Sequence, residues 1–231
     1  MLVLHHHPLS APSRFVRLVL AEYGEEVTFN EVPPLIRSEA LLMLNPSGTL
    51  PVLVEDGGTV IAEAPVIAEY LAETRGARFG EDSLMPATAV ERAETRRLVH
   101  WFSNKMHNEA TRHLVTELAL KRITPPAEGG GAPDSVAIRA ARANIRTHVQ
   151  YISYLAERRD WLAGREMSLA DLAAAAEISC VDYLGEVPWE KDEDAAKTWY
   201  ARVKSRLSFR PLLADRIKGV VPAPHYGDLD F

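Results

Sequence analysis

The residues best suited to chemistry lie near the start of the chain, where a histidine run is followed by two serines. His5, His6 and His7 are consecutive, and Ser10 and Ser13 follow in the stretch SAPSRFVR. Successive side chains of a strand point to opposite faces, so the three imidazoles could not converge on one metal ion. A serine hydroxyl can donate a hydrogen bond to a ligand, and such serines equally mark a turn or a helix N-cap. We predict no metal site here, and the residues alone leave the structural and the ligand-binding roles of Ser10 and Ser13 equally open.

Composition limits the classes of function. The net charge of −6, without a block of basic residues, disfavours nucleic-acid binding. No apolar run is long enough to cross a bilayer, and no signal peptide precedes the first strand-like segment. The single cysteine, Cys180, excludes an internal disulfide and fits a reducing compartment. We predict a cytoplasmic protein that neither binds nucleic acid nor inserts into a membrane.

The stretch from residue 45 to residue 71 sets the architecture of the N-terminal half. It reads NPSGTLPVLVEDGGTVIAEAPVIAEYL, which combines a turn, a strand opened by Pro51, a DGG hairpin turn, a second strand and a helix. A proline at the mouth of a strand marks an edge, a first residue or a cis bond. The helix is predicted to begin at Glu63-Ala64-Pro65, because proline is tolerated in a first turn.

Upstream of this stretch the pattern alternates between strand and helix. Leu2–His6 and Val27–Val32 are predicted to be strands, and Ser13–Tyr23 is predicted to be a helix that ends at Gly24. Residues 1–76 therefore give the order β-α-β-(α)-β-β-α, which indicates a thioredoxin-like domain. Residues 77–86 lose the periodic pattern and are predicted to be a linker.

Residues 87–219 are predicted to form an all-α domain. An amphipathic helix over 87–122 carries apolar residues at every fourth position, and these are Leu98, Phe102, Met106, Ala110, Leu114 and Leu118. A second helix begins at the Asp134 cap and packs against the first. Ser168 and Asp171 form a capping box ahead of an Ala-rich buried helix, so we assign Asp171 to folding. The predicted fold class is α+β, and residues 220–231 are a C-terminal tail.

This order of elements, together with the Leu50-Pro51 pair, resembles the glutathione S-transferase superfamily. The resemblance implies a glutathione pocket in which Leu50 pairs with the tripeptide beside a cis Pro51, and Glu63 lies near the γ-glutamyl end. Ser10 stands where the family places the donor that stabilises the glutathione thiolate. The serine that usually follows the acid is replaced by Ala64. Loss of that hydroxyl is expected to weaken glutathione binding by about ten- to a hundredfold.

The tail adds a second kind of signal. It contains two prolines, shows no helical periodicity and ends in acidic and aromatic residues. Such a segment either packs on its own domain or offers anchors to a partner, and the sequence leaves both readings open. The candidate partner-binding residues are Tyr226, Asp228, Leu229, Asp230 and Phe231.

Residues 155–164, 168–176, 181–189 and 208–216, joined to the tail, resemble the FtsZ-localised division proteins of alphaproteobacteria. That family has a transferase-like fold. The resemblance implies a homodimer that binds FtsZ filaments at the division site, regulates constriction, uses no cofactor and could meet further division proteins. The first hypothesis is therefore a non-enzymatic FtsZ-binding regulator. The alternative is a glutathione-dependent transferase or isomerase.

Overall fold

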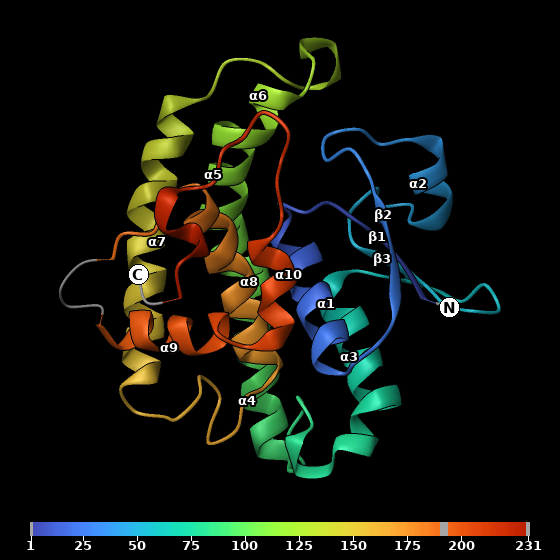
Figure 1. Ribbon diagram of the computed structural model, residues 1–231, viewed down its shortest axis with the longest axis vertical. Coiled ribbons are helices and arrows are strands. Elements are labelled where there is room, and N and C mark those ends of the chain that lie inside the picture. Colours follow the sequence, from blue (N-terminus) through green and yellow to red (C-terminus); the bar gives the residue numbers. More distant parts are fainter. Residues whose placement is uncertain (1, 190–193, 230–231) are drawn as a thin grey trace.

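The computed structural model describes residues 2–189 and 194–229. Figure 1 shows a small mixed sheet with its helices on one side of the molecule and a larger helical region on the other. Helix α1 (Ala11–Glu22) lies between them and packs against α3 (Ala64–Arg75) of the first half and α8 (Leu169–Tyr183) of the second. The thioredoxin-like half is thereby joined to the helical half through one continuous apolar core.

The sheet of the N-terminal half has four strands in the order β2-β1-β3-β4. The β1 and β2 strands are parallel, whereas β1 with β3 and β3 with β4 are antiparallel. The strands are β1 (Leu2–His6), β2 (Val27–Glu31), β3 (Val52–Val54) and β4 (Val60–Ala62). With α1, α2 (Glu39–Leu44) and α3 between or after them, the predicted order of elements is confirmed.

The start of α1 differs in detail from the expectation. The helix begins two residues earlier than predicted, and Ser10 is its N-cap, with its Oγ 3.4 Å from the backbone nitrogen of Ser13. Ser13 therefore lies in the first turn and is buried. Its Oγ accepts a hydrogen bond from the backbone N–H of His7 at 3.3 Å. An N-cap at Ser13 is wrong, because Pro12 can occupy the first turn without loss of a helical hydrogen bond.

The histidine run follows the strand alternation. His5 pairs in register with Asn30, and its Nδ1 lies 2.9 Å from the Asn30 side-chain nitrogen. His6 is buried on the other face of the sheet, where its ring meets that of Phe29 edge-on at 5.2 Å between centroids. The imidazoles of neighbouring positions therefore have separate environments, as the period of two requires.

The helical half is built around one long helix that runs from residue 89 to residue 123. It comprises α4 (Ala89–His100), a π-helical segment (Trp101–Thr111), α5 (Arg112–Val115), a second π-helical segment (Thr116–Leu120) and α6 (Lys121–Ile123). Helix α7 (Ser135–Ala156) and the central α8 pack against it, and α9 (Asp194–Lys204) packs against α7 and α8. Helix α10 (Arg210–Leu213) follows α9 in the chain (Figure 1). Among the described residues, no helix is long and apolar enough to span a membrane.

The π-helical segments explain why apolar side chains of the long helix recur every fourth residue. In a pure α-helix a step of four residues turns about 40° beyond a full circle, so such a stripe would rotate away from the core. A π turn contains more residues than an α turn, which compensates for that rotation. Leu98, Phe102, Met106, Ala110 and Leu114 are all fully buried as a result, and Leu118 is partly buried.

Helix α8 forms the centre of the helical half, and each of its residues is buried. The predicted capping box is confirmed at its start. The Ser168 side chain accepts from the backbone of the first turn, and the Asp171 carboxylate accepts from the Ser168 backbone N–H at 3.0 Å. Because this first turn of α8 is buried, water cannot reach its backbone N–H groups, which therefore need hydrogen-bond acceptors from the protein itself.

Candidate functional site

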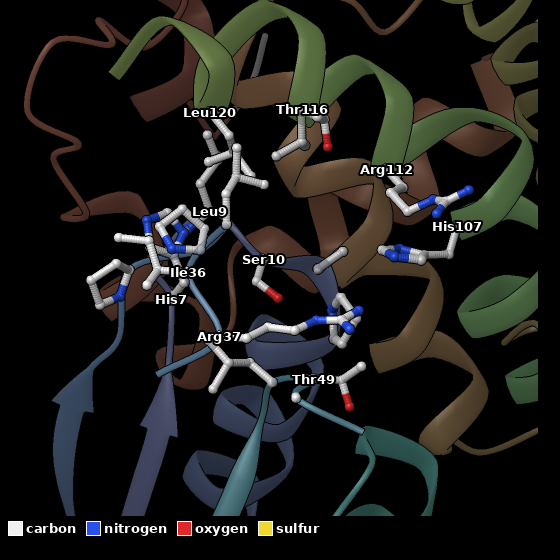
Figure 2. A pocket seen from close by; sticks show the side chains of 18 of the residues that line it. His7, Leu9, Ser10, Ile36, Arg37, Thr49, His107, Arg112, Thr116 and Leu120 are labelled. Carbon is white, nitrogen blue, oxygen red and sulfur yellow. The ribbon is translucent and has the colours of Figure 1, made fainter. Parts of the chain in front are cut away.

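A cavity of about 340 Å³ opens between the two halves of the molecule. One wall comes from the loop between β1 and α1 and from the Gly48–Leu50 turn, and the facing wall comes from the long helix (Figure 2). The long helix contributes His107, Thr111, Arg112 and Thr116. Side chains from both halves are therefore needed to complete this pocket.

Ser10 lines the pocket, as the sequence predicts. Its Oγ accepts the N-cap hydrogen bond, so the hydroxyl proton remains free to donate toward the cavity. Figure 2 shows the hydroxyl pointing into the space between Arg37 and the long helix. Position and chemistry thus allow Ser10 to donate a hydrogen bond to an anionic ligand while it caps α1.

The turn before β3 supplies the second predicted part of the pocket. The Leu50-Pro51 peptide bond is cis, and Leu50 is part of the wall. The pairing of Leu50 with a bound peptide stays a prediction.

Glu63 and Ala64 are placed at the start of α3, outside the lining of this cavity. The Glu63 backbone has a φ of 72°, and its carboxylate already accepts hydrogen bonds from Ser47 Oγ at 3.1 Å and Thr49 Oγ1 at 2.6 Å. Ala64 is buried and offers no hydroxyl. A γ-glutamyl group at this point would compete with internal hydrogen bonds, so these two residues fit glutathione less well than Ser10 and Leu50 do.

Several pocket residues were missed by sequence reasoning, chiefly the basic ones. Arg37 enters from the segment after β2, and Arg112 and His107 enter from the long helix on the opposite side (Figure 2). Burial alone would lower the pKa of His107, but the Glu177 carboxylate, 3.2 Å from its Nδ1, raises that pKa above the ordinary value. Arg37 and Arg112 therefore bring positive charge to the pocket from both halves, which suits an anionic ligand, whereas His107 is paired with Glu177.

The tail divides into a packed base and an exposed end. Tyr226 is buried and its hydroxyl donates to the backbone oxygen of Leu212 at 3.1 Å, so it is removed from the predicted set of surface anchors. The reason is that the Tyr183 ring offers a T-shaped packing site at 5.0 Å. Asp228 and Leu229 are exposed. Asp230 and Phe231 lie outside the described residues.

Cys180 lies on α8 and is fully buried. Burial raises the pKa of its thiol to about 12, while the nearby Arg14 acts in the opposite direction. At neutral pH the group is therefore a protonated thiol rather than the thiolate needed for nucleophilic chemistry. No group of three His, Cys, Asp or Glu side chains in the described part of the chain is arranged to hold a metal ion.

The chain is similar to known proteins over its whole length. Residues 4–79 match the family model of the glutathione S-transferase N-terminal domain. FtsZ-localized protein A of Caulobacter vibrioides is 48% identical over 236 aligned positions, which cover 99% of this chain and 97% of that protein.

Two solved structures match equally completely. A glutathione S-transferase from Sinorhizobium meliloti 1021 superposes with a TM-score of 0.97 at 51% identity and full coverage of both chains. FzlA from C. crescentus gives a TM-score of 0.91 at 47% identity, covering 100% of this chain and 99% of that one. With the four-stranded sheet, the cis-proline turn and the helical second half, these matches show that the chain belongs to the glutathione S-transferase superfamily, in the family of FtsZ-localized protein A.

Proposed function

We propose that this protein is a non-enzymatic, homodimeric regulator of cell division that binds FtsZ filaments at the division site and modulates constriction. The observation that carries the proposal is the 48% identity, along nearly the full chain, to FtsZ-localized protein A. The tail supports it, because the exposed Asp228 and Leu229 extend from a base that is fixed by the buried Tyr226. Exposed terminal residues that extend from a packed base are accessible to a protein partner. The role needs no cofactor.

Co-sedimentation with FtsZ polymers is the direct test. We expect the purified protein to pellet with FtsZ when GTP is present and to stay in the supernatant when FtsZ is kept unpolymerised with GDP. Sedimentation velocity of the protein alone measures the homodimer. Equal recovery in the supernatant under both nucleotide conditions would contradict FtsZ-filament binding.

The exposed end of the tail should contribute to that binding without contributing to folding. We expect deletion of residues 228–231 to weaken co-sedimentation at least about tenfold, because terminal anchors outside the packed base are lost. The melting temperature should change little, since Tyr226 stays in place. Loss of the charge can be tested with Asp228→Asn against Glu128→Gln, which alters an acidic residue in a different exposed loop. Equal binding by these two variants would argue against a role for the tail end.

A glutathione-dependent transferase or isomerase is the second candidate. It is favoured by one specific observation, namely that the cavity of about 340 Å³ brings Ser10 and Leu50 together with basic side chains. Ser10 would hold the thiolate by donating its hydroxyl proton, and the Leu50 backbone would pair with the peptide. The occupied carboxylate of Glu63 and the missing hydroxyl at Ala64 reduce the fit at the γ-glutamyl end.

Calorimetric titration with glutathione separates the two candidates. If the protein is only a binding module, titration should give no heat of binding at micromolar to low millimolar glutathione while FtsZ co-sedimentation persists. Micromolar affinity together with loss of conjugating activity in Ser10→Ala would instead establish the enzyme. Because Ser10 also caps α1, the fold of that variant should be checked with Ser10→Asp, which keeps a capping oxygen but repels a thiolate.

A further inference from the structure

The base of the tail covers a cluster of fully buried charges. Lys204 at the end of α9 and Asp182 on α8 both have side chains with 0% exposure, and Nζ lies 3.3 Å from Oδ2. Arg14 is also fully buried, donating to the Pro8 backbone oxygen at 2.7 Å and to Ser179 Oγ at 2.9 Å. Burial of isolated ions is costly, so such groups require close partners on every side.

The tail supplies several of those partners. His225 Nε2 lies 3.1 Å from Asp182 Oδ1, on the side of the carboxylate opposite Lys204. The Tyr226 ring lies 5.6 Å from Lys204 Nζ and 5.8 Å from the Arg14 guanidinium carbon, so one ring contacts both buried cations. Its face stabilises positive charge through its π electrons. The tail therefore completes the enclosure of the cluster, which Tyr200 and Asp215 also contact.

Backbone hydrogen bonds hold the same segment. The Ala223 N–H donates to the Tyr183 backbone oxygen at 2.8 Å, and the Tyr183 hydroxyl donates to the Val220 backbone oxygen at 3.0 Å. Burial lowers the pKa of Lys204, and the Asp182 carboxylate opposes that shift. If the tail left this position, water would reach the ion pair and the ring contacts with both cations would be lost. Displacement of the tail would therefore cost the free energy of the contacts that stabilise these buried charges.

We propose that residues 220–229 form a latched arm, in which the buried Lys204–Asp182 pair and Arg14 fix His225 and Tyr226 so that Asp228 and Leu229 are held ready for a partner. Lys204 and Asp182 are positioning residues that do not themselves touch the partner. A fixed arm loses less conformational freedom on binding than a disordered one, so the latch raises affinity. The statement about affinity rests on the proposed binding to FtsZ, whereas the statement about the latch does not.

Hydrogen exchange of the tail in Lys204→Met tests the latch. The substitution keeps the length of the side chain and removes the charge. We expect the amides of Ala223, Tyr226 and Asp228 to exchange at least about tenfold faster than in the wild type, because their bonds lie in the segment that the cluster holds. Lys218→Met, the same change at an exposed position, is the matched control and should leave these rates unchanged. Unchanged rates in Lys204→Met would overturn the latch.

A milder variant keeps the test decisive if Lys204→Met does not fold. His225→Leu removes the imidazole that lies 3.1 Å from Asp182 Oδ1 and leaves both members of the buried ion pair in place. Exchange in the tail should then rise by about threefold, with the rates of α8 amides unchanged. Unchanged tail exchange in this variant would show that the base of the tail is not held by these contacts, which overturns the latch.

Binding measurements then separate the latch from the proposed function. If the wild type co-sediments with FtsZ polymers, we expect Lys204→Met to bind at least about tenfold more weakly and Lys218→Met to bind normally. Full-strength binding by a Lys204→Met protein with a loosened tail would overturn the link between latch and affinity. Failure of the wild type itself to sediment would refute FtsZ binding, while the exchange rates would still decide whether the latch exists.

Discussion

Replacing Asp171 with alanine is expected to lower the free energy of unfolding by about 4 kcal/mol, because it removes the acceptor of several buried donors at once. The carboxylate accepts from the backbone N–H of Leu162 at 2.9 Å, the N–H and hydroxyl of Ser168 at 3.0 and 3.1 Å, and the Trp199 indole N–H at 3.0 Å. Burial raises the pKa of Asp171, and these same hydrogen bonds oppose that shift. Four separate bonds therefore depend on one side chain.

Thermal and urea unfolding measure this effect. A loss of about 4 kcal/mol in a chain of this length should lower the melting temperature by roughly 10 °C. Asp134→Ala is the control, because Asp134 is the N-cap of α7 and its carboxylate accepts from two backbone N–H groups at an exposed site. That change should lower the free energy of unfolding much less, because water can reach the N–H groups that it leaves unpaired. Equal losses in the two variants would mean that Asp171 acts as an ordinary cap and not as the junction between α8, α9 and the preceding loop.

Acidification is expected to destabilise the fold between pH 6.5 and pH 4 through two buried histidines. The pKa of His6 is lowered to about 4, first by burial and then by the charge of Arg17, and the pKa of His7 is lowered to about 4 by burial and Arg14. In the unfolded chain both groups bind protons near pH 6.5. Between these values the unfolded state binds more protons than the folded state, so stability rises with pH and falls on acidification.

The local geometry explains why His7 resists protonation. Its Nδ1 accepts a hydrogen bond from the backbone N–H of Leu9 at 3.2 Å, and a proton on that nitrogen would abolish the bond. At pH 4.5 each of the two histidines should lower the free energy of unfolding by about 2 kcal/mol relative to pH 7. Between pH 7 and pH 4.5, we expect His6→Asn and His7→Asn each to lose about 2 kcal/mol less free energy of unfolding than the wild type.

Urea titrations at pH 7 and pH 4.5 provide the measurement. Asparagine at position 7 keeps an acceptor oxygen near the place of Nδ1, so stability at pH 7 should fall less than on replacement with alanine. His100→Asn, on the exposed face of α4, is the control. If the pH dependence of both buried variants matched that of the control, the acid sensitivity would have to come from other groups.

Much of the fold was predictable because its signals are local. The DGG turn, the proline before β3 and the Ser168-Asp171 capping box each act within a few residues, and the structure places all three as expected. The stripe in the long helix also identified the buried face correctly. It could not show that the helix has π-helical segments, because the interpretation of the spacing assumed the regular period of an α-helix.

The candidate site was predictable only on the N-terminal side. Ser10 and Leu50 follow from chain-local features, whereas Arg112 and His107 come from a helix whose approach to the first half depends on tertiary packing. Tertiary packing also decides the role of the tail, where it buries a residue that the sequence offered as a surface anchor. An aromatic residue such as Tyr226 suits either a core or a partner, and only the presence of the Tyr183 ring and the Arg14 and Lys204 charges decides for the core.

The buried position of Cys180 makes this chain a convenient carrier for a single spectroscopic probe. Its only native thiol is shielded and stays protonated at neutral pH, so maleimide dyes or spin labels would react selectively with a cysteine placed on the surface. Leu229→Cys puts such a handle at the exposed end of the tail. Fluorescence anisotropy or distance measurements by paramagnetic resonance could then follow the tail without any removal of the natural cysteine.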